Sequence, residues 1–372
     1  IAGHLGRKFH DFSSNIVVEF DDVLISDVLK KAGYVTGCSG KWGVGSPPPL
    51  DDPNQHGFDH FYGYVSMWHA HNFYPEFLIL NGKKSPLRNE VPDPWKSSDG
   101  RGVASKKVDY APDLIAQDAL NFVANNKGRP FFLYWALNVP HANNEARNQG
   151  MEVPDWGNFA EADWPDPEKG FASMIRNIDR DVGRMLAHLK QLGLDENTIV
   201  VFTSDNGPHQ EGGHKADFFN SNGELRGIKR DLYEGGIRVP TIVRWPGHVA
   251  ANSQSDMISG FQDWFATFSD LASNVADPQD GISLRPLLTG KGRQETHSYL
   301  YWEFLEQGGR QAILKDNWKA VRLDWDVKPD GPIELYDISK DKAEQTNIAS
   351  SHADIVAEMA EIMKIAHTPL SN

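Results

Sequence analysis

Residues 131–137 form an uninterrupted apolar run, FFLYWAL. A strand that is apolar at every position is expected to be buried on both faces, which is typical of a parallel sheet between helices. Helical patterns and strand candidates alternate along most of the chain, with helices at 22–32, 111–126 and 170–192 and further strands at 34–39, 198–204 and 240–245. This alternation predicts an α/β fold with a mostly parallel central sheet flanked by helices.

The pattern changes after about residue 290. Short strand candidates follow one another at 298–304, 311–315, 318–323 and 334–337, with Asp316-Asn317 as a turn, and 352–366 has the pattern of a closing helix. We therefore divide the chain into a main domain, residues 1–290, and a small C-terminal subdomain, residues 291–372, with an antiparallel sheet and a helix. Long loops at 43–60, 82–109, 141–168 and 206–236 are expected to carry function.

Composition excludes several classes of function. The 372 residues include 37 basic and 51 acidic side chains, a formal net charge of −14. This balance disfavours a nucleic-acid partner, which needs clustered Lys and Arg, and means that an anionic substrate must be held by a few local cations. No apolar run approaches the roughly 18–20 residues of a membrane span. Cys38 is the single cysteine, so an intrachain disulfide framework is excluded.

The segment T-S-D-N-G-P at 203–208 directly follows a strand candidate. Ligands of open α/β sheets bind beyond the carboxyl ends of the strands. The carboxylate of Asp205 and the amide carbonyl of Asn206 suit a hard cation such as Ca²⁺ or Mg²⁺. Asp-Asn-Gly is also ordinary turn chemistry, and the spacing alone leaves the cation site and the turn equally open.

Two further strand ends carry polar side chains. Lys41 lies in S-G-K-W-G-V-G at 39–45, between glycines that let the backbone approach a ligand, and His141 follows the 131–137 strand. A solvated lysine and a structural histidine are the commoner cases for each residue alone. Because Lys41, His141 and Asp205 each follow a strand, we expect them to converge at one edge of one sheet.

The segment at 225–240, LRGIKRDLYEGGIRVP, is basic although the protein is acidic. Glycines within it permit tight turns. The alternatives are a solvated charged loop and a binding loop for an anion, with four candidate cations, Arg226, Lys229, Arg230 and Arg238.

These segments together resemble the sulfatase family of the alkaline phosphatase superfamily, and most of all its bacterial arylsulfatase-type members. The resemblance covers nearly the whole chain and keeps the family's order. It is carried by GKWGVG at 40–45, GFDHFYGY at 57–64, HAHNFYP at 69–75, PFFLYWALNVPHANNE at 130–145, SDNGP at 204–208, LRGIKRDLYEGGIRVP at 225–240, DGISLRPLLTG at 280–290 and ELYDISKDKAEQTNIA at 334–349.

The resemblance implies an alkaline phosphatase-like fold and hydrolysis of a sulfate ester by metal-assisted formylglycine chemistry. It implies that Asp205 and Asn206 are calcium ligands, with magnesium as an alternative. Lys41 matches a lysine that binds the sulfate group, and His141 a histidine that contacts the sulfate and the leaving-group oxygen. Lys229 matches a lysine that bridges the sulfate and the nucleophile. Cations and an imidazole at these places would stabilise the charge that develops on the leaving oxygen.

The sequence departs from the family at the nucleophile. Formylglycine is made from Cys or Ser in a C/S-x-P-S-R-like motif, and none of the 372 residues form one. Cys38 has Gly40 in the place of the motif's proline and Trp42 in the place of its arginine. We therefore expect Cys38 to be a buried strand residue.

Two further departures accompany it. The family's first Asp-Asp metal pair has only Asp21-Asp22 and Asp51-Asp52 as candidates, which we expect to be caps or exposed loop residues, and a frequent family histidine is Gly43 here. Residues 1–8 resemble the stretch after the nucleophile motif, and the chain begins with Ile1 rather than Met. We interpret the chain as amino-terminally truncated, and we expect it to be inactive alone and its gene to encode a periplasmic or secreted sulfatase.

Two alternatives to a sulfatase are compatible with the sequence. One is a phosphoesterase or phosphonate hydrolase of the same superfamily, and another is a non-catalytic anion-binding remnant. A sulfated small molecule or carbohydrate is the expected partner. Carbohydrate is favoured because aromatic side chains in long loops could stack on sugar rings. For each of these side chains, packing within the loop is the commoner role. The candidates are Trp68, His69, His71, Tyr74 and Trp95. Roles for His209 and His214 are not assigned.

Overall fold

The computed structural model describes residues 23–44, 52–92, 99–272 and 280–367. Its largest sheet has five strands in the order β4-β3-β2-β1-β5. The strand β1 pairs in parallel with β2 on one side and with β5 on the other, and β3 and β4 extend the sheet as an antiparallel hairpin. The strands are β1 (Val35–Lys41), β2 (His60–Tyr64), β3 (Phe77–Leu80), β4 (Lys83–Pro86) and β5 (Phe131–Ala136).

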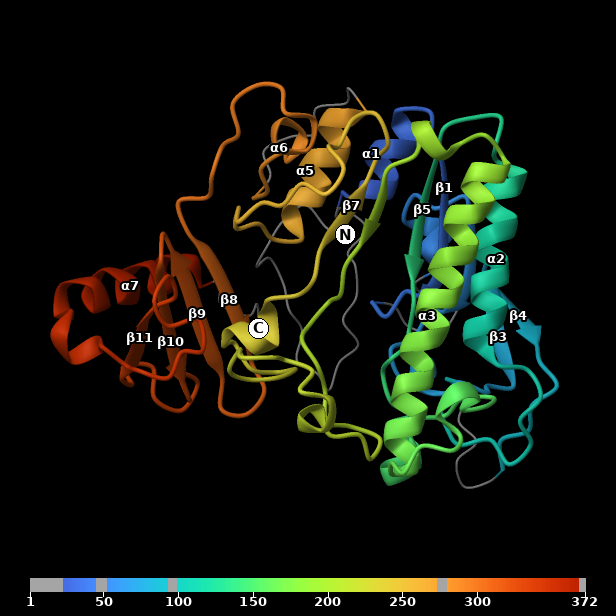
Figure 1. Cartoon of the computed structure of the whole chain (residues 1–372), viewed down its shortest axis with the longest axis horizontal. Coiled ribbons are helices and arrows are strands. Elements are labelled where there is room, and N and C mark those ends of the chain that lie inside the picture. The colour runs from blue at the N-terminus through green and yellow to red at the C-terminus, as the bar shows by residue number, and fades with distance from the viewer. Residues whose placement is uncertain (1–22, 45–51, 93–98, 273–279, 368–372) are drawn as a thin grey trace.

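Helices cover both faces of this sheet, as Figure 1 shows. On one face, Leu133 of β5 packs with Met185 of α3 and with residues of α2. On the other face, Phe132 packs with residues of α1 and with Phe265 of α5. The helices are α1 (Ile25–Lys31), α2 (Ala111–Asn125), α3 (Asp166–Gln191) and α5 (Gln262–Leu271). The expected α/β fold with a flanked, mostly parallel central sheet is confirmed.

The strand β5 differs from expectation in its burial. Every residue of Phe131–Ala136 is only half-buried. The strand lies at the end of its sheet, and a cavity of about 1650 Å³ opens beside it. On the far side of this cavity, β6 (Val200–Phe202) pairs with β7 (Ile242–Arg244) in a separate antiparallel sheet. The prediction that Asp205 follows a strand of the same sheet as Lys41 and His141 is therefore wrong, because the cavity separates β6 from β5.

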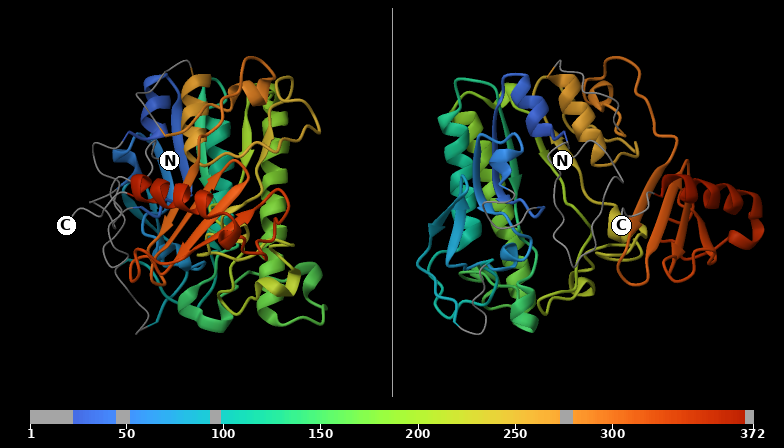
Figure 2. Two further views of the ribbon diagram at one scale, coloured as in Figure 1. Left: turned by 90° about the vertical axis from the view of Figure 1, so that its left-hand side faces the viewer. Right: turned by 180° about the vertical axis from the view of Figure 1, so that it is seen from behind.

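The C-terminal region forms its own sheet, set to one side of the larger one (Figure 2). Four antiparallel strands lie in the order β11-β10-β9-β8, and Met359 and Met363 of α7 pack against them. Asp316, with φ at 53°, makes the turn between β9 and β10. The elements are β8 (Leu300–Phe304), β9 (Arg310–Lys315), β10 (Trp318–Leu323), β11 (Ile333–Asp337) and α7 (Ala353–Ala366), after the short helices α4 (Glu234–Ile237) and α6 (Arg285–Thr289).

Two sequence predictions about single residues hold. Cys38 is fully buried in β1, and burial raises the pKa of its thiol. Asp52 caps a short 3₁₀ helix by accepting a hydrogen bond from the backbone N–H of Asn54. Asp21, Asp22 and Asp51 lie outside the described residues. Within the described ranges, no helix is long and apolar enough to cross a bilayer.

A buried lysine joins the C-terminal sheet to the basic segment 225–240. Lys319 of β10 has no exposed side-chain surface, and its Nζ donates a hydrogen bond of 2.7 Å to Glu234 Oε1. The same Nζ lies 3.8 Å from Glu344 Oε1. The backbone N–H of Glu234 also donates to Glu344 Oε2 at 2.7 Å. One ammonium group is thus shared by two buried carboxyl groups.

This cluster predicts a pH effect on stability. Burial, and then the charge of Glu234, raise the pKa of Glu344 from 4.5 to about 7. Because the folded protein holds this proton more tightly, the stabilisation is fully present below about pH 4.5 and is lost as pH rises through about 7. Glu344→Gln keeps the acceptor for Glu234 and cannot ionise, so it should flatten the decline.

Urea unfolding at several pH values between about 5 and 8 measures this slope. Glu361→Gln, in the exposed face of α7, is the matched control and should keep the wild-type slope. An equal slope in Glu344→Gln and wild type would contradict the assignment.

Candidate active site

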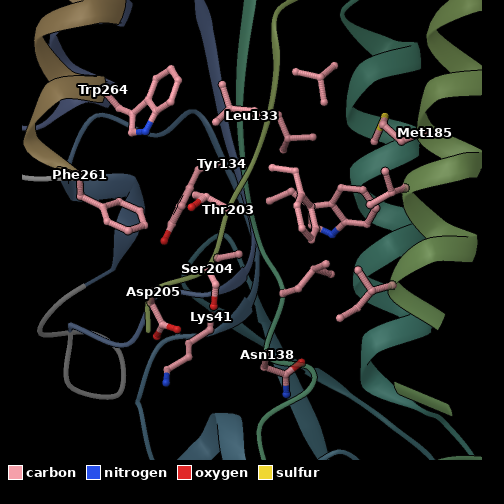
Figure 3. Close-up of a pocket in the computed structure, with 18 of the residues that line it drawn as sticks. Lys41, Leu133, Tyr134, Asn138, Met185, Thr203, Ser204, Asp205, Phe261 and Trp264 are labelled. Carbon is pink, nitrogen blue, oxygen red and sulfur yellow. The ribbon is translucent and has the colours of Figure 1, made fainter. Parts of the chain in front are cut away.

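Lys41 is placed by the close approach of β1 and β5. It is the last residue of β1, and it follows Gly40, whose φ is 123°. A Cβ at Gly40 would lie 1.9 Å from the carbonyl oxygen of Ala136, so the strands can meet here only without a side chain. Burial lowers the pKa of Lys41, while nearby Asp205 opposes that shift. Figure 3 shows Lys41 and Asp205 at the same end of the cavity.

His141 is held in one tautomer by its neighbours. Its Nδ1 lies 2.7 Å from the carbonyl oxygen of Ala142, so Nδ1 carries the proton and donates it. Its Nε2 is then free to accept a hydrogen bond of 2.9 Å from Lys229 Nζ. Burial, and then the charges of Lys229 and Lys41, lower the pKa of His141 to about 3. The imidazole is therefore neutral near pH 7.

Lys229 is the centre of the polar contacts. Besides His141, its Nζ donates to Glu211 Oε2 at 2.9 Å, and its side chain is 15% exposed. Its backbone N–H donates to the carbonyl oxygen of Pro208 at 2.8 Å, which ties the basic segment to the segment that follows β6. Lys41, His141, Asp205 and Lys229 all line the same cavity, and Asp205 and Lys229 lie close enough to Lys41 for their charges to act on its pKa. The structure thus brings together four residues that are distant in sequence.

Glu211 was not identified from the sequence. Its carboxylate accepts hydrogen bonds from Lys229 and, at 2.7 Å, from Arg230 Nη1, and it lies 3.7 Å from His141 Nε2. Burial opposes its ionisation, but the hydrogen bond and charge of Lys229, together with the hydrogen bond from Arg230, outweigh burial and lower its pKa to about 2. A single Glu in a polar loop gives no sequence signal, because only the fold places it between these cations.

Asp205 and Asn206 provide two side-chain oxygen ligands for a cation. Asp205 is exposed to the cavity, and Asn206 donates its amide to the carbonyl oxygen of Gly207 at 2.8 Å. Lys229 pairs with Glu211 rather than with Asp205. Ca²⁺ takes six to eight oxygen ligands. Within the described part of the chain, no group of three or more His, Cys, Asp or Glu side chains is arranged to hold a metal, so these residues do not form a complete calcium site.

The arginines of the basic segment divide into two groups. Arg230 belongs to the site through Glu211. Arg226 instead donates to the hydroxyl of Tyr336 at 2.9 Å and stacks its guanidinium 3.8 Å from the ring of Tyr233. Arg238 lies 3.6 Å from Glu234. Arg226 therefore anchors the segment to the C-terminal sheet rather than facing the anion site.

The aromatic candidates for sugar binding are mostly packing residues. His69, His71 and Tyr74 are buried, while Trp68 is half-buried with its ring 5.0 Å from the guanidinium of Arg101. Trp95 lies outside the described residues. The ring of His71 nevertheless stacks on that of His141, with centroids 5.1 Å apart. Of the four candidates that the structure describes, His71 is thus the one whose ring stacks on His141.

The two unassigned histidines have structural partners. His209 Nε2 donates to the carbonyl oxygen of Pro140 at 2.7 Å, and its Nδ1 accepts from the backbone N–H of Glu211 at 3.0 Å. His214 is fully buried against Phe171, with ring centroids 3.7 Å apart. His209 therefore links the loop of His141 to Glu211. His214 belongs to the hydrophobic core that contains Phe171.

Comparison with known proteins gives a consistent set of relatives. The Sulfatase family profile matches residues 6–275, and that of the N-sulphoglucosamine sulphohydrolase C-terminal region matches residues 227–368. An N-acetylgalactosamine-6-O-sulfatase of Bacteroides thetaiotaomicron is 28% identical over 96% of this chain and 79% of its own. The N-acetylgalactosamine-6-sulfatase of Mus musculus is 32% identical over 81% of this chain, which spans 55% of that relative. The crystal structure of Ps i-CgsB with k-i-k-neocarrahexaose superposes with a TM-score of 0.77 at 27% identity, covering 95% and 76% of the two chains.

The position of Glu211 predicts a change in anion binding. A carboxylate among Lys41, His141 and Lys229 repels an incoming tetrahedral oxyanion. Glu211→Gln keeps hydrogen-bonding capacity toward Lys229 and removes the charge, so it should bind inorganic sulfate about tenfold more tightly at low ionic strength. Calorimetric titration with sodium sulfate measures the effect.

Glu306→Gln is the control, because Glu306 contacts Arg230 from the more exposed side at 3.1 Å. Its sulfate affinity should change less. Equal affinities in Glu211→Gln and wild type would place the anion away from Lys229.

Proposed function

The chain belongs to the sulfatase family of sulfuric ester hydrolases, and we propose that it contributes the anion-binding part of an active site that hydrolyses a sulfate ester. The observation that carries this proposal is the proximity of Lys41, His141 and Lys229 in one cavity. Three nitrogen groups that are distant in sequence meet there, two of them as ammonium groups. A sulfate ester is a fixed anion, and such an arrangement suits its three outer oxygens.

Each side chain has a distinct task in this proposal. Lys41 and Lys229 act as positive charges on the sulfate oxygens, where their attraction is strengthened by partial burial. A bound sulfate ester places negative charge beside His141 and so raises the pKa of its imidazole. With Nδ1 held by Ala142, the added proton enters at Nε2, which then faces the site. His141 can donate from there to the leaving oxygen as charge develops on it.

Glu211 has to release Lys229 before the sulfate ester can bind to it. It occupies hydrogen-bond donors of Lys229 that an anion would use. We propose that Glu211 holds Lys229 in place in the free protein and moves toward Arg230 when the ester binds. Arg230 already donates to the other carboxylate oxygen, so the carboxylate keeps one partner throughout.

The proposal also includes a nucleophile and a cation. Following the family resemblance, we propose a formylglycine nucleophile supplied from outside the described residues. Asp205 and Asn206 would contribute oxygen ligands to Ca²⁺ or Mg²⁺, and further ligands would come from elsewhere. A bound cation would supply positive charge to the sulfate oxygens.

We propose a sulfated carbohydrate as substrate and a periplasmic or secreted location. The support is the nature of the relatives, which include two N-acetylgalactosamine-6-sulfatases and a structure with a bound neocarrahexaose. Trp68, whose ring lies 5.5 Å from that of His71, offers an aromatic surface beside Arg101, although the two are partly engaged with each other.

The first test uses the product of the gene's whole reading frame, made in a host that produces formylglycine. It should hydrolyse 4-nitrophenyl sulfate, and Lys229→Ala should lower kcat/KM by about 100-fold or more, the usual loss for one donor to developing charge. Lys215→Ala, an exposed lysine of the same long loop, should keep wild-type activity. The 372-residue chain, tested beside it, should show neither a burst nor turnover.

Other outcomes identify other functions. Faster hydrolysis of 4-nitrophenyl phosphate would indicate a phosphoesterase. Sulfate binding without hydrolysis of either ester would indicate a non-catalytic anion-binding protein. Turnover by the 372-residue chain that is lost in Lys229→Ala would show that another group is the nucleophile.

The second test concerns the cation. Activity of the full-length protein should fall in a chelator and return with Ca²⁺ or Mg²⁺, because oxygen donors such as Asp205 select hard cations. Asp205→Ala should remove most of the activity, while Asp217→Ala, an exposed aspartate of the same loop, should not. Full activity in the chelator would refute the metal assignment.

A further inference from the structure

We propose that Arg310 of the C-terminal sheet is a positioning residue for the site, because it holds the strained turn that presents Lys229 to the cavity. Arg310 is not one of the residues that line the cavity, so it acts on a bound anion only through Lys229. Its effect on catalysis rests on the proposed function, whereas its effect on the position of Lys229 does not.

Lys229 stands at the corner of a tight turn. The backbone N–H of Asp231 donates to the carbonyl oxygen of Ile228 at 2.8 Å, and this bond closes the turn. The carboxylate of Asp231 in return accepts the backbone N–H of Ile228 at 2.9 Å. Lys229 and Arg230 are therefore the two central residues of the turn, and the backbone at these residues decides where the side chain of Lys229 begins.

The backbone of this turn is strained at Arg230, whose φ is 79°. A positive φ at the third residue of a turn favours glycine, because a Cβ there collides with the neighbouring backbone. A residue with a side chain keeps such a conformation only where the surrounding contacts determine it. The turn that carries Lys229 therefore needs a partner that holds the peptide on the carboxyl side of Arg230.

Arg310 makes the contacts that such a partner needs. Its Nη1 donates to the carbonyl oxygen of Arg230 at 2.8 Å, and the same nitrogen donates to Asp231 Oδ1. The side chains of Arg310 and Asp231 are only 16% and 26% exposed. Hydrogen bonds from a guanidinium to a carboxylate are stronger than neutral ones, and partial burial limits their screening by salt. One guanidinium thus fixes two consecutive residues of the turn.

The backbone of Arg310 is itself fixed on both sides. It is the first residue of β9, which lies between β10 and β8, and it stands opposite Leu323 on one strand and Phe304 on the other. On its opposite side, the turn packs against α4, where a Cβ at Gly236 would lie 2.1 Å from the carbonyl oxygen of Asp231. The turn is therefore held between β9 and α4.

The position of the turn decides the hydrogen bonds of Lys229. Its Nζ lies 2.9 Å from His141 Nε2 and 2.9 Å from Glu211 Oε2. Such bonds tolerate only a few tenths of an ångström, so a shift of the turn by about 1 Å would break them. Arg310→Met removes the guanidinium and keeps an unbranched side chain. We expect it to let Arg230 relax to a negative φ and to carry Lys229 away from His141.

Nitrogen NMR on the product of the gene's whole reading frame tests the position of Lys229 without using activity. The ¹⁵N resonance of His141 Nε2 in the neutral ring reports whether this nitrogen accepts a hydrogen bond, and Lys229→Ala gives the resonance without the donor. In Arg310→Met, the resonance should move most of the way to that of Lys229→Ala. In the double variant Arg310→Met/Arg230→Gly it should return toward wild type, because glycine adopts a positive φ without strain.

Lys315→Met is the matched control, because Lys315 stands at the other end of β9 and contacts Glu358. Its resonance should stay at the wild-type position. Asp231→Asn keeps the acceptor for Ile228 and loses the charge that Arg310 contacts, so it should move the resonance in the same direction, and it decides the outcome if Arg310→Met does not fold. A wild-type resonance in the folded variant would overturn the proposal.

Kinetics separate a positioning role from general stabilisation of the fold. Arg310→Met should lower kcat/KM for 4-nitrophenyl sulfate about tenfold, mainly through kcat. In the Arg230→Gly background the same substitution should lower it at most about twofold, because the strain that Arg310 holds is already absent. An equal loss in both backgrounds would mean that Arg310 only stabilises the fold, and would overturn the proposal. If the wild type hydrolyses no sulfate ester, the proposed function fails, while the ¹⁵N resonance still decides the position of Lys229.

Discussion

Two glycines allow the central strands to approach closely enough to form the site. A Cβ at Gly40 would collide with the carbonyl of Ala136 on β5, and one at Gly63 would lie 2.0 Å from the carbonyl oxygen of Gly40. The three parallel strands β2, β1 and β5 therefore meet at a point where side chains are excluded. Lys41 follows directly, so its position relative to His141 is fixed by backbone contacts rather than by its own flexible side chain. A residue larger than glycine at position 40 would push β1 and β5 apart and so move both Lys41 and His141.

Electrostatic balance governs the rest of the site. Two lysines and an imidazole converge in a partly buried place, which lowers the pKa of Lys41 and of His141. Glu211 compensates part of this charge, and its own pKa falls in return. An exogenous anion would meet the same cations that Glu211 now satisfies. The free protein is thus prepared for a negative group without leaving its lysines unpaired.

The sequence predicts the helices and strands whose hydrophobic pattern is strong. The amphipathic stripe of α3, the apolar run of β5 and the successive strands of the C-terminal sheet were all predicted close to their observed bounds. The β3–β4 hairpin was not predicted, because β3 received no assignment and β4 falls in the 82–109 loop, although Asn81-Gly82, with φ of 46° and 76°, carries a recognisable hairpin signal. Resemblance indicated Lys41, His141 and Lys229, but Glu211 depends on tertiary placement alone. The half-exposed state of β5 was also unpredictable, because an apolar run does not show whether another element packs against each side of the strand.

The anchoring of the basic segment couples the two sheets more closely than their separate topologies suggest. Arg226 bonds to Tyr336, Lys319 to Glu234, and Arg310 donates to the backbone carbonyl of Arg230 at 2.8 Å. Lys229 lies among these contacts, although it belongs to the main domain by sequence. Gene segments that encode the two sheets are therefore poor units for recombination. A shuffled protein that joined this main domain to a foreign C-terminal sheet would inherit every candidate site residue and still lack the scaffold that holds Lys229.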